Sequence, residues 1–388
     1  MLRTECPNPQ FSRDGLIILN GKWSFFSDSV PSAHEIEVPF APESKLSGIN
    51  YTGFIKDCEY SRKFTVDAPE ENERLFLRFG AVNYEATVYV NGEYVGVHRG
   101  GYTSFGFDVT DKVRGGENEL KVKVHNDVTE NVPTGKQSAR PESFGCFYTR
   151  VTGIWQPVWL ERTPVNYIES LKFYPDVEGC AVKTELVCEG EGEAEIAVTY
   201  DGRLVGEAKG YVKCRRAFDI KLTEKHLWEI GNGRLYDVTV RYCGDEVKSY
   251  FGLRQVGYDG MKFMLNGKSV FQRLSLDQGY YPDGLYTAPD DESMRRDVEL
   301  GLRLGFNGAR LHQKVFEPRF LYHCDRAGYF VWGEFPSWGV DYENLSALGT
   351  LVGEWTEAVE RDFNHPSIIT WCPLNETWES LKDARKVR

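Results

Sequence analysis

A carboxamide and a carboxylate stand side by side near the C-terminal end of the chain, at Asn375 and Glu376. They follow an apolar run at 367–374, SIITWCPL, whose β-branched and aromatic residues are typical of a strand buried on both faces of a parallel sheet. The residues just past the carboxyl end of such a strand line the functional site in barrels and doubly wound sheets. Here they could hold and protonate a substrate oxygen. The alternative is that the pair caps the next helix.

Three further predicted strands also end on polar or ionisable residues. These are Asp277 and Gln278, then His312 and Gln313, then Glu334. If the strands are parallel neighbours, all of these side chains meet Asn375 and Glu376 at one mouth of a sheet or barrel, which is where barrel chemistry resides.

Each of these residues also has a purely structural interpretation when it is taken alone. His312 is then a hydrogen-bonded core histidine, Glu334 an ion-pair partner of Arg310, and Asp277 a cap. Together they favour a site. Trp338 and Trp378 lie in the loops just beyond, where flat apolar faces could stack on pyranose rings or simply pack.

Motifs for other chemistries are missing from the sequence. His312, Asp277 and Glu334 could in principle form a facial triad, but no H-x-x-x-H or H-E-x-x-H pair accompanies them. We therefore predict no metal. No G-x-G-x-x-G or G-K-[ST] motif supports a nucleotide, and no G-x-S-x-G elbow supports a serine hydrolase. We predict no cofactor.

Composition and charge narrow the class of partner. The 388 residues are 41% hydrophobic and 14% aromatic, enough for several cores. A net charge of -12 and a pI near 5.3 argue against nucleic acid or an anionic membrane as partner. A neutral small substrate is compatible with this charge.

The nine cysteines are scattered and include no C-x-x-C pair, which is typical of a reducing compartment. The N-terminus has no apolar signal region, and no run is long enough to span a membrane. We predict a cytoplasmic protein.

The secondary structure that must position the candidate residues differs between parts of the chain. From 22 to 163 the sequence alternates in short segments, with a hairpin signal at Asn91 and Gly92, which predicts a jelly-roll β-sandwich. From 164 to about 257 a second set of strands, including separate ones at 181–188 and 193–200, with a turn at Asp201 and Gly202, predicts an immunoglobulin-like β-sandwich.

After Tyr258, strands and helices alternate, which predicts a parallel sheet. A hairpin signal stands at Asn266 and Gly267. We predict a helix that begins around 289–291 and closes at Gly305, helices at 318–328 and 350–364, and strands at 306–312, 329–335 and 367–376. The predicted fold is multidomain β plus α/β, with domains at 1–163, 164–258 and 259–388, the last being the first half of a (β/α) TIM barrel.

With these elements in this order, and with GIWQPVWLE closing the first domain, the chain resembles glycoside hydrolase family 2, the β-galactosidase, β-glucuronidase and β-mannosidase group. The matching barrel stretches are LGFNGARLHQKV, FLYHCDRAGYFVWGEFP and HPSIITWCPLNE. The resemblance implies that Glu376 is the general acid/base, Asn375 a ligand of the sugar 2-hydroxyl and His312 a substrate-pocket residue. Asp277 and Glu334 match positions that line the sugar subsite.

Two departures from the family pattern accompany this resemblance. Where better-known members have a proline soon after the histidine, this sequence reads His312, Gln313, Lys314. The family nucleophile lies on a later barrel strand, so we expect it beyond Arg388 and expect this chain, as a C-terminally truncated member, to have little turnover alone.

The predicted function is that of a retaining, β-galactosidase-like exo-β-glycosidase acting on a carbohydrate substrate. The main alternative is a non-catalytic carbohydrate-binding or assembly module formed by the two β-domains. A third interpretation takes Asp277 or Glu334 as the second carboxylate. Exposed sheet edges favour a homo-oligomer.

Overall fold

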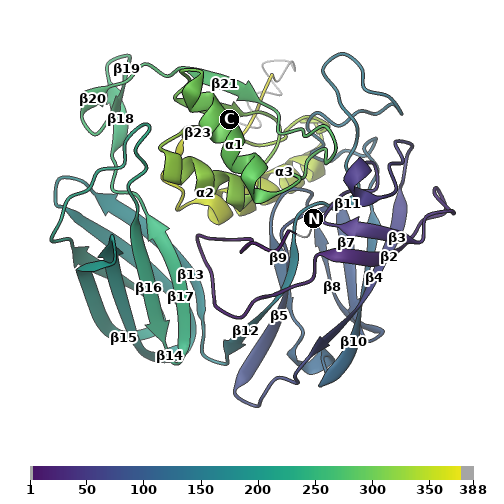
Figure 1. The fold of residues 1–388 in the computed structure, drawn as a ribbon, viewed down its shortest axis with the longest axis horizontal. Coiled ribbons are helices and arrows are strands. Elements are labelled where there is room, and N and C mark those ends of the chain that lie inside the picture. The colour runs from purple at the N-terminus through teal and green to yellow at the C-terminus, as the bar shows by residue number, and fades with distance from the viewer. Residues whose placement is uncertain (1–2, 377–388) are drawn as a thin grey trace.

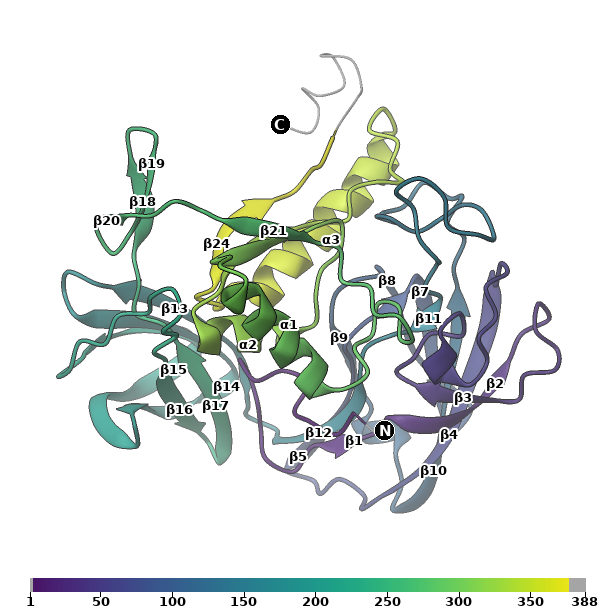
Figure 2. The same cartoon turned by 45° about the horizontal axis from the view of Figure 1, so that its top comes forward.

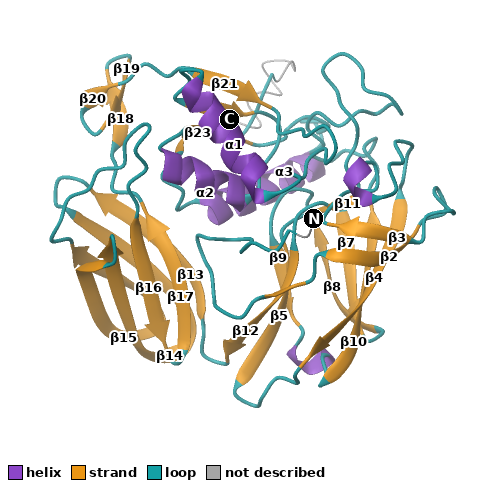
Figure 3. Cartoon of the chain, in the orientation of Figure 1, coloured by secondary structure: helices purple, strands orange, loops and turns teal. Residues whose placement is uncertain are grey.

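The computed structural model describes residues 3–376. Most of its regular structure is β, and the three α-helices gather in one region, between two large β units (Figures 1 and 3). The coarse prediction of a multidomain, mainly β chain with few helices is confirmed. None of the described helices is both long and apolar enough to cross a lipid bilayer.

The first β unit contains a six-stranded and a four-stranded sheet, both antiparallel. The larger has the order β3-β2-β4-β10-β7-β8, with strands Glu35–Val38, Gly21–Phe26, Asp57–Val66, Gly116–His125, Glu85–Val90 and Glu93–Arg99. The smaller has the order β1-β12-β5-β9, with strands Ile17–Ile18, Val158–Pro164, Glu73–Phe79 and Phe105–Asp108. A two-stranded ladder joins β11 (Gly153–Ile154) to β6 (Val82–Asn83). Two short 3-10 turns lie at Lys45–Ser47 and Thr110–Lys112.

Alternation of buried and exposed residues along these strands places one hydrophobic core between the two sheets. Trp23 and Tyr60 enter this core from the larger sheet, and Leu77 and Leu160 enter it from the smaller one. Asn91 and Gly92 join β7 to β8 with φ of 53° and 81°, the positive values that the hairpin signal requires.

The second β unit is one antiparallel five-stranded sheet with its own core. Its strands are β13 (Ile168–Asp176), β14 (Ala181–Tyr200), β15 (Arg203–Lys221), β16 (Tyr236–Tyr242) and β17 (Asp245–Phe251). The sequence predicted separate strands around 181–188 and 193–200, and this was wrong. They form one strand, β14, whose register against β15 shifts between Val187 and Glu191. A bulge of this kind bends a strand without ending it, so one strand can serve both halves of a folded sheet.

A small three-stranded sheet leads into the helical region. Its strands are β18 (Val256–Asp259), β19 (Lys262–Leu265) and β20 (Lys268–Ser269), and Asn266 and Gly267 form the predicted turn, with φ of 50° and 75°.

The third region contains a four-stranded sheet in chain order, and all of its pairings are parallel, as predicted. The strands are β21 (Leu274–Asp277), β22 (Gly308–Leu311), β23 (Phe330–Glu334) and β24 (Ile368–Cys372), and the helices are α1 (Asp291–Arg303), α2 (Pro318–Ala327) and α3 (Leu345–Asp362). Apolar residues of α1 and α2, among them Val298 and Leu321, pack against the strands in a shared core.

Helix boundaries follow the capping chemistry of the sequence. Asp290, which stands within the predicted start at 289–291, caps α1 by accepting a hydrogen bond from the Ser293 amide. The predicted start of α3 at residue 350 was wrong. Asn344 accepts hydrogen bonds from the amides of Ser346 and Ala347, so this helix begins earlier, at Leu345.

The expectation that the strand before Asn375 is buried on both faces was also wrong. Only Ile368 of β24 is buried, and the rest of the strand is half-buried. Among the described residues β24 has β23 as its only strand neighbour, so it is the edge of the sheet.

Candidate active site

The four parallel strands bring their carboxyl ends to one edge of the sheet. In the register of the sheet, Asp277 pairs with Leu311, and Leu311 pairs with Gly333. Glu334 is level with Cys372, three residues before Asn375. The ends of the four strands that precede the predicted polar residues therefore lie at one edge of the sheet.

Glu334 is the centre of the hydrogen-bond network at this edge. The residue is 2% exposed, and Arg310 Nε donates to its Oε2 at 2.5 Å. The Gln313 amide donates to its Oε1 at 3.0 Å, and His312 Nε2 lies 3.6 Å from the same oxygen. A carboxylate with both oxygens occupied in this way holds its neighbours in place.

Arg310 connects this carboxylate to Asn375. Its Nη2 donates to Asn375 Oδ1 at 2.7 Å. The Asn375 main chain is held as well, because its amide donates to Ser337 Oγ at 3.2 Å and its carbonyl accepts from Trp338 Nε1 at 3.0 Å. Asn375 is only 7% exposed, yet its Nδ2 has no hydrogen-bond partner in residues 3–376. A fixed, buried and unpaired donor is costly unless a ligand pairs with it.

His312 lies within this network, and Asp277 lies outside it. Gln278 Nε2 is 3.4 Å from His312 Nδ1, a weak contact. Burial lowers the pKa of His312, and the charges of Lys136 and Arg310 act in the same direction, against the raising effect of Glu334. The Asp277 carboxylate instead accepts a hydrogen bond from the Gly279 amide at 2.8 Å, the structural role considered above. Burial raises the pKa of Asp277.

Glu376 lines a different part of this edge. Its φ is 47°, its side chain is exposed, and it lines a pocket of about 490 Å³ with Trp338, Phe144 and Phe147. The ring of Phe147 lies 5.3 Å from that of Trp338, and the Trp338 amide donates to Gln313 Oε1 at 3.1 Å. The predicted stacking residue Trp378 lies outside the described residues.

The sequence interpretation missed the wall of this pocket that comes from the first β unit. Residues 126–152 connect β10 to β11 without any strand or helix, and they carry Lys136, Phe144 and Phe147. Thr134 attaches this loop to the third region, because its amide donates to the Trp338 carbonyl at 2.8 Å. The length of the loop was the available signal, since structureless loops of this length inside a domain are usually functional.

Metal ligation is not evident at this edge. Between residues 3 and 376, no three His, Cys, Asp or Glu side chains are grouped so that they could hold a metal ion.

Comparison with known proteins shows what this chain is similar to. Residues 45–164 match the family model described as "Glycosyl hydrolases family 2, sugar binding domain". A putative beta-glucuronidase of Formosa agariphila is 28% identical over 345 residues, which are 82% of this chain and 40% of that protein. A beta-galactosidase of Thermoanaerobacter pseudethanolicus is 29% identical over 344 residues, 80% of this chain and 44% of that protein. The chain is similar to members of glycoside hydrolase family 2.

The architecture of this chain also matches solved structures. Bifidobacterium dentium beta-glucuronidase, solved with coumarin-3-O-glucuronide, superposes with a TM-score of 0.83 over 97% of this chain and 70% of that one, at 22% identity. The chain spans 40% of the length of the Formosa relative and 44% of that of the Thermoanaerobacter relative.

Proposed function

We propose that this chain is the sugar-binding and proton-donating part of a retaining exo-β-glycosidase, β-galactosidase-like, that hydrolyses terminal β-linked sugars. Glu376 is the general acid/base, and it protonates the glycosidic oxygen of a sugar bound at the carboxyl edge of the parallel sheet. Asn375 donates from its unpaired Nδ2 to the sugar 2-hydroxyl. His312, Gln278 and Trp338 complete the binding surface.

One observation carries the proposal most directly. The buried, unpaired amide nitrogen of Asn375 stands next to the exposed carboxyl-bearing residue Glu376. The ion pair of Arg310 and Glu334 fixes the amide through its oxygen, so the free nitrogen has a defined direction. An enzyme gains from such pre-oriented donors because no reorganisation is needed when charge develops on the substrate.

Retention requires a second carboxyl group as nucleophile. We do not assign that role to Glu334, whose two oxygens are held by Arg310 and Gln313. We do not assign it to Asp277 either, because its carboxylate holds the turn at Gly279. The resemblance to family 2 favours a nucleophile on a later strand of the barrel.

The finer domain assignment is part of the same proposal. The first β unit is a jelly roll, the second is an immunoglobulin-like sandwich, and the parallel sheet with its helices is the first half of a (β/α) barrel.

The cytoplasmic location is supported by the nine cysteines, all of which are unpaired.

The test is a panel of nitrophenyl and alkyl β-glycosides, given to this chain and to a longer form that continues past Arg388. In the active form, Glu376→Gln is expected to lower kcat/KM for an alkyl glycoside by roughly 10²–10⁴-fold, the usual contribution of a general acid. The loss for a nitrophenyl glycoside should be much smaller, because that leaving group departs without a proton. Glu360→Gln, an exposed change on α3, is the matched control.

Equal kcat/KM values for wild type and Glu376→Gln on both substrate types would contradict the role of Glu376. Saturable sugar binding without hydrolysis by either form would favour the non-catalytic alternative instead.

A further inference from the structure

Lys314 is a buried lysine beside the candidate site to which the proposed function gives no role. It stands two residues after His312, where the sequence departs from the family pattern. The residue is 2% exposed, and its Nζ donates to the carbonyl oxygens of Gly279 at 2.6 Å and Tyr286 at 2.7 Å. Both acceptors belong to loop 278–290, which connects β21 to α1. One ammonium group therefore joins the beginning of this loop to a point near its end.

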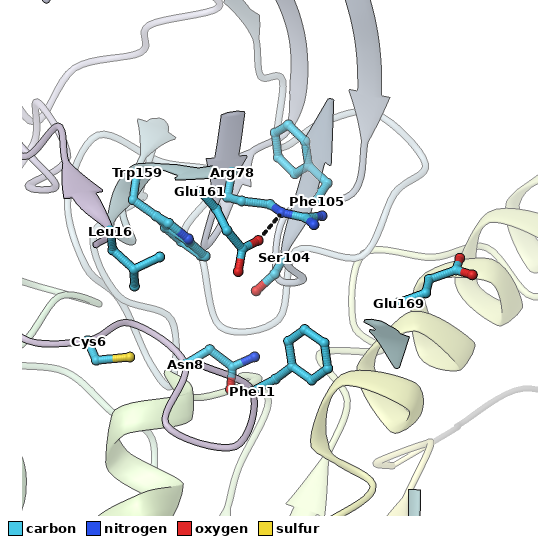
Figure 4. Close-up of a pocket in the computed structure, with 10 residues that line it drawn as sticks. All are labelled: Cys6, Asn8, Phe11, Leu16, Arg78, Ser104, Phe105, Trp159, Glu161 and Glu169. Atoms are coloured by element: carbon cyan, nitrogen blue, oxygen red, sulfur yellow. Dashed lines mark hydrogen bonds and ion pairs between the residues drawn. The ribbon is translucent and has the colours of Figure 1, made fainter. Parts of the chain in front are cut away.

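Lys314 has no carboxylate partner within residues 3–376. Elsewhere a buried carboxylate pairs with such a charge, as Figure 4 shows for Glu161, whose Oε2 accepts from Arg78 Nε at 3.0 Å. Burial lowers the pKa of Lys314 to about 8, against the raising effect of three carboxyl groups that form no ion pair with it. These groups belong to Glu317, Asp277 and Asp297. An ammonium group that is costly to bury is a candidate for a role at the site beside it.

The shape of loop 278–290 depends on support from outside the loop. Leu285, which pairs with Tyr281 through two main-chain hydrogen bonds, has a φ of 56°. A leucine keeps this left-handed conformation only where its surroundings hold it. Gly279 has a φ of 64°, and a Cβ there would lie 2.7 Å from Lys314 Nζ, so glycine is what lets the ammonium group reach the loop.

The loop lies between the candidate site and the first β unit (Figures 1 and 2). The ring centroid of Tyr280 is 4.9 Å from that of Tyr148 in the first β unit. At the start of the loop, Gln278 Nε2 is 3.4 Å from His312 Nδ1. A shift of the loop would therefore move Gln278 relative to His312 in the proposed sugar-binding surface.

We propose that Lys314 is a positioning residue of the candidate active site. Its ammonium group fixes loop 278–290, and with it the place of Gln278 beside His312. Because this group is buried and bonded to main-chain oxygens, it acts through Gln278 and not on the substrate. The effect on substrate binding rests on the proposed function, whereas the effect on the loop does not.

The kinetic test uses an alkyl β-glycoside and the longer form that continues past Arg388. Lys314→Met removes the ammonium group but keeps an unbranched side chain of similar length. It should raise KM about tenfold and leave kcat within about twofold, because Gln278 contributes to binding and not to proton transfer. Lys314→Arg keeps the charge and the donors, so it should restore part of the loss.

Lys45→Met is the matched control for the kinetic test. Lys45 also donates to the loop, from Nζ to Asp283 Oδ1 at 2.9 Å, but its side chain is 66% exposed. Exposed pairs contribute little, so its loss should leave KM unchanged.

The second test requires no activity and uses the 388-residue chain. Hydrogen exchange of the Tyr281 and Leu285 amides, which pair inside the loop, should quicken about tenfold in Lys314→Met, while exchange of the α1 amides stays unchanged. Should this variant not fold, the wild type gives the same measurement. Lys314 loses its charge between about pH 7 and pH 9, and the weaker hydrogen bonds of a neutral amine should lower the protection of the loop relative to α1.

Unchanged loop exchange, or an unchanged KM in Lys314→Met, would overturn the proposal. So would faster exchange throughout the third region, which would show that Lys314 stabilises the fold as a whole, and an equal rise of KM in Lys45→Met. If no variant of the longer form hydrolyses a glycoside, the proposed function fails, and the exchange measurement alone decides whether Lys314 positions the loop.

Discussion

Single residues show how a charge from the first β unit acts on the candidate site. Lys136 is 4% exposed, and its ammonium group lies 3.7 Å from the centroid of the Trp338 ring. Within the described part of the chain it forms no ion pair, so the ring is its main partner. This uncompensated charge is one of the causes that lower the pKa of His312.

We therefore expect Lys136→Met to raise the pKa of His312, since a nearby positive charge disfavours the imidazolium form. Burial of His312, the largest cause of its lowered pKa, stays in place, so the rise should be partial. The measurement is an NMR titration of the imidazole ring, assigned with His312→Gln. Lys136→Arg keeps the charge and should leave the pKa unchanged. A lower pKa of His312 in Lys136→Met would show that loss of packing outweighs loss of charge.

At the scale of elements, α3 attaches the third region to the first β unit through a buried carboxyl group. Tyr84 donates to Glu354 Oε1 at 2.5 Å, and the Gly101 amide lies 3.2 Å from Oε2. Burial raises the pKa of Glu354 to about 7, despite the lowering effect of both hydrogen bonds. The helix is therefore docked by a carboxyl group that is protonated in mildly acidic solution.

This raised pKa has a defined effect on stability. The folded chain keeps the proton between about pH 4.5 and pH 7, where the unfolded chain has lost it, so the free energy of unfolding falls as pH rises through that window. Glu354→Gln cannot ionise, and it should reduce this fall by about 3 kcal/mol, measured by urea unfolding at several pH values. Some dependence should remain, because burial also raises the pKa of Glu43 to about 7.

Glu357→Gln, one turn later on α3, is the control for this prediction. The hydrogen bond with His98 lowers the pKa of Glu357. Replacing Glu357 should therefore not reduce the fall of the free energy of unfolding with rising pH. An unchanged pH dependence in Glu354→Gln would mean that Glu354 is ionised in the folded chain.

At the scale of the whole molecule, the N-terminal segment connects all three regions (Figure 2). Arg3 donates to Glu317 Oε2 at 2.8 Å, just before α2. Arg13 pairs with Glu161 of the first β unit and, through two nitrogens, with Asp245 of the second. One buried guanidinium group thus holds the two β units together.

Arg13→Ala should destabilise the chain by about 3–5 kcal/mol, because it leaves Glu161 and Asp245 buried without this partner. Chemical denaturation measures the loss, and limited proteolysis should show earlier cleavage between 163 and 168. Arg13→Lys keeps the charge but cannot pair in two directions, so its loss should be intermediate. Equal stability of Arg13→Ala and wild type would indicate that the β units are held by other contacts.

Much of the third region could be predicted because its signals are local. The alternation of strands and helices, the start of α1 near residue 290 and the turn at Asn266 depend on residues close in sequence. The single strand β14 and the edge position of β24 were missed, because a bulge and a missing neighbour leave no mark on local periodicity.

The sequence by itself determined which residues stand at the ends of the parallel strands, because period and turn chemistry fix where each strand stops. Only the tertiary structure decided which of them face one another. It joined Glu334 through Arg310 to Asn375, left Asp277 on its own turn, and brought Lys136 to Trp338 from another β unit. The physical reason is that such contacts depend on how separately formed sheets pack together. Lys136 and Trp338 are some 200 positions apart, and no local sequence pattern predicts a contact over that separation.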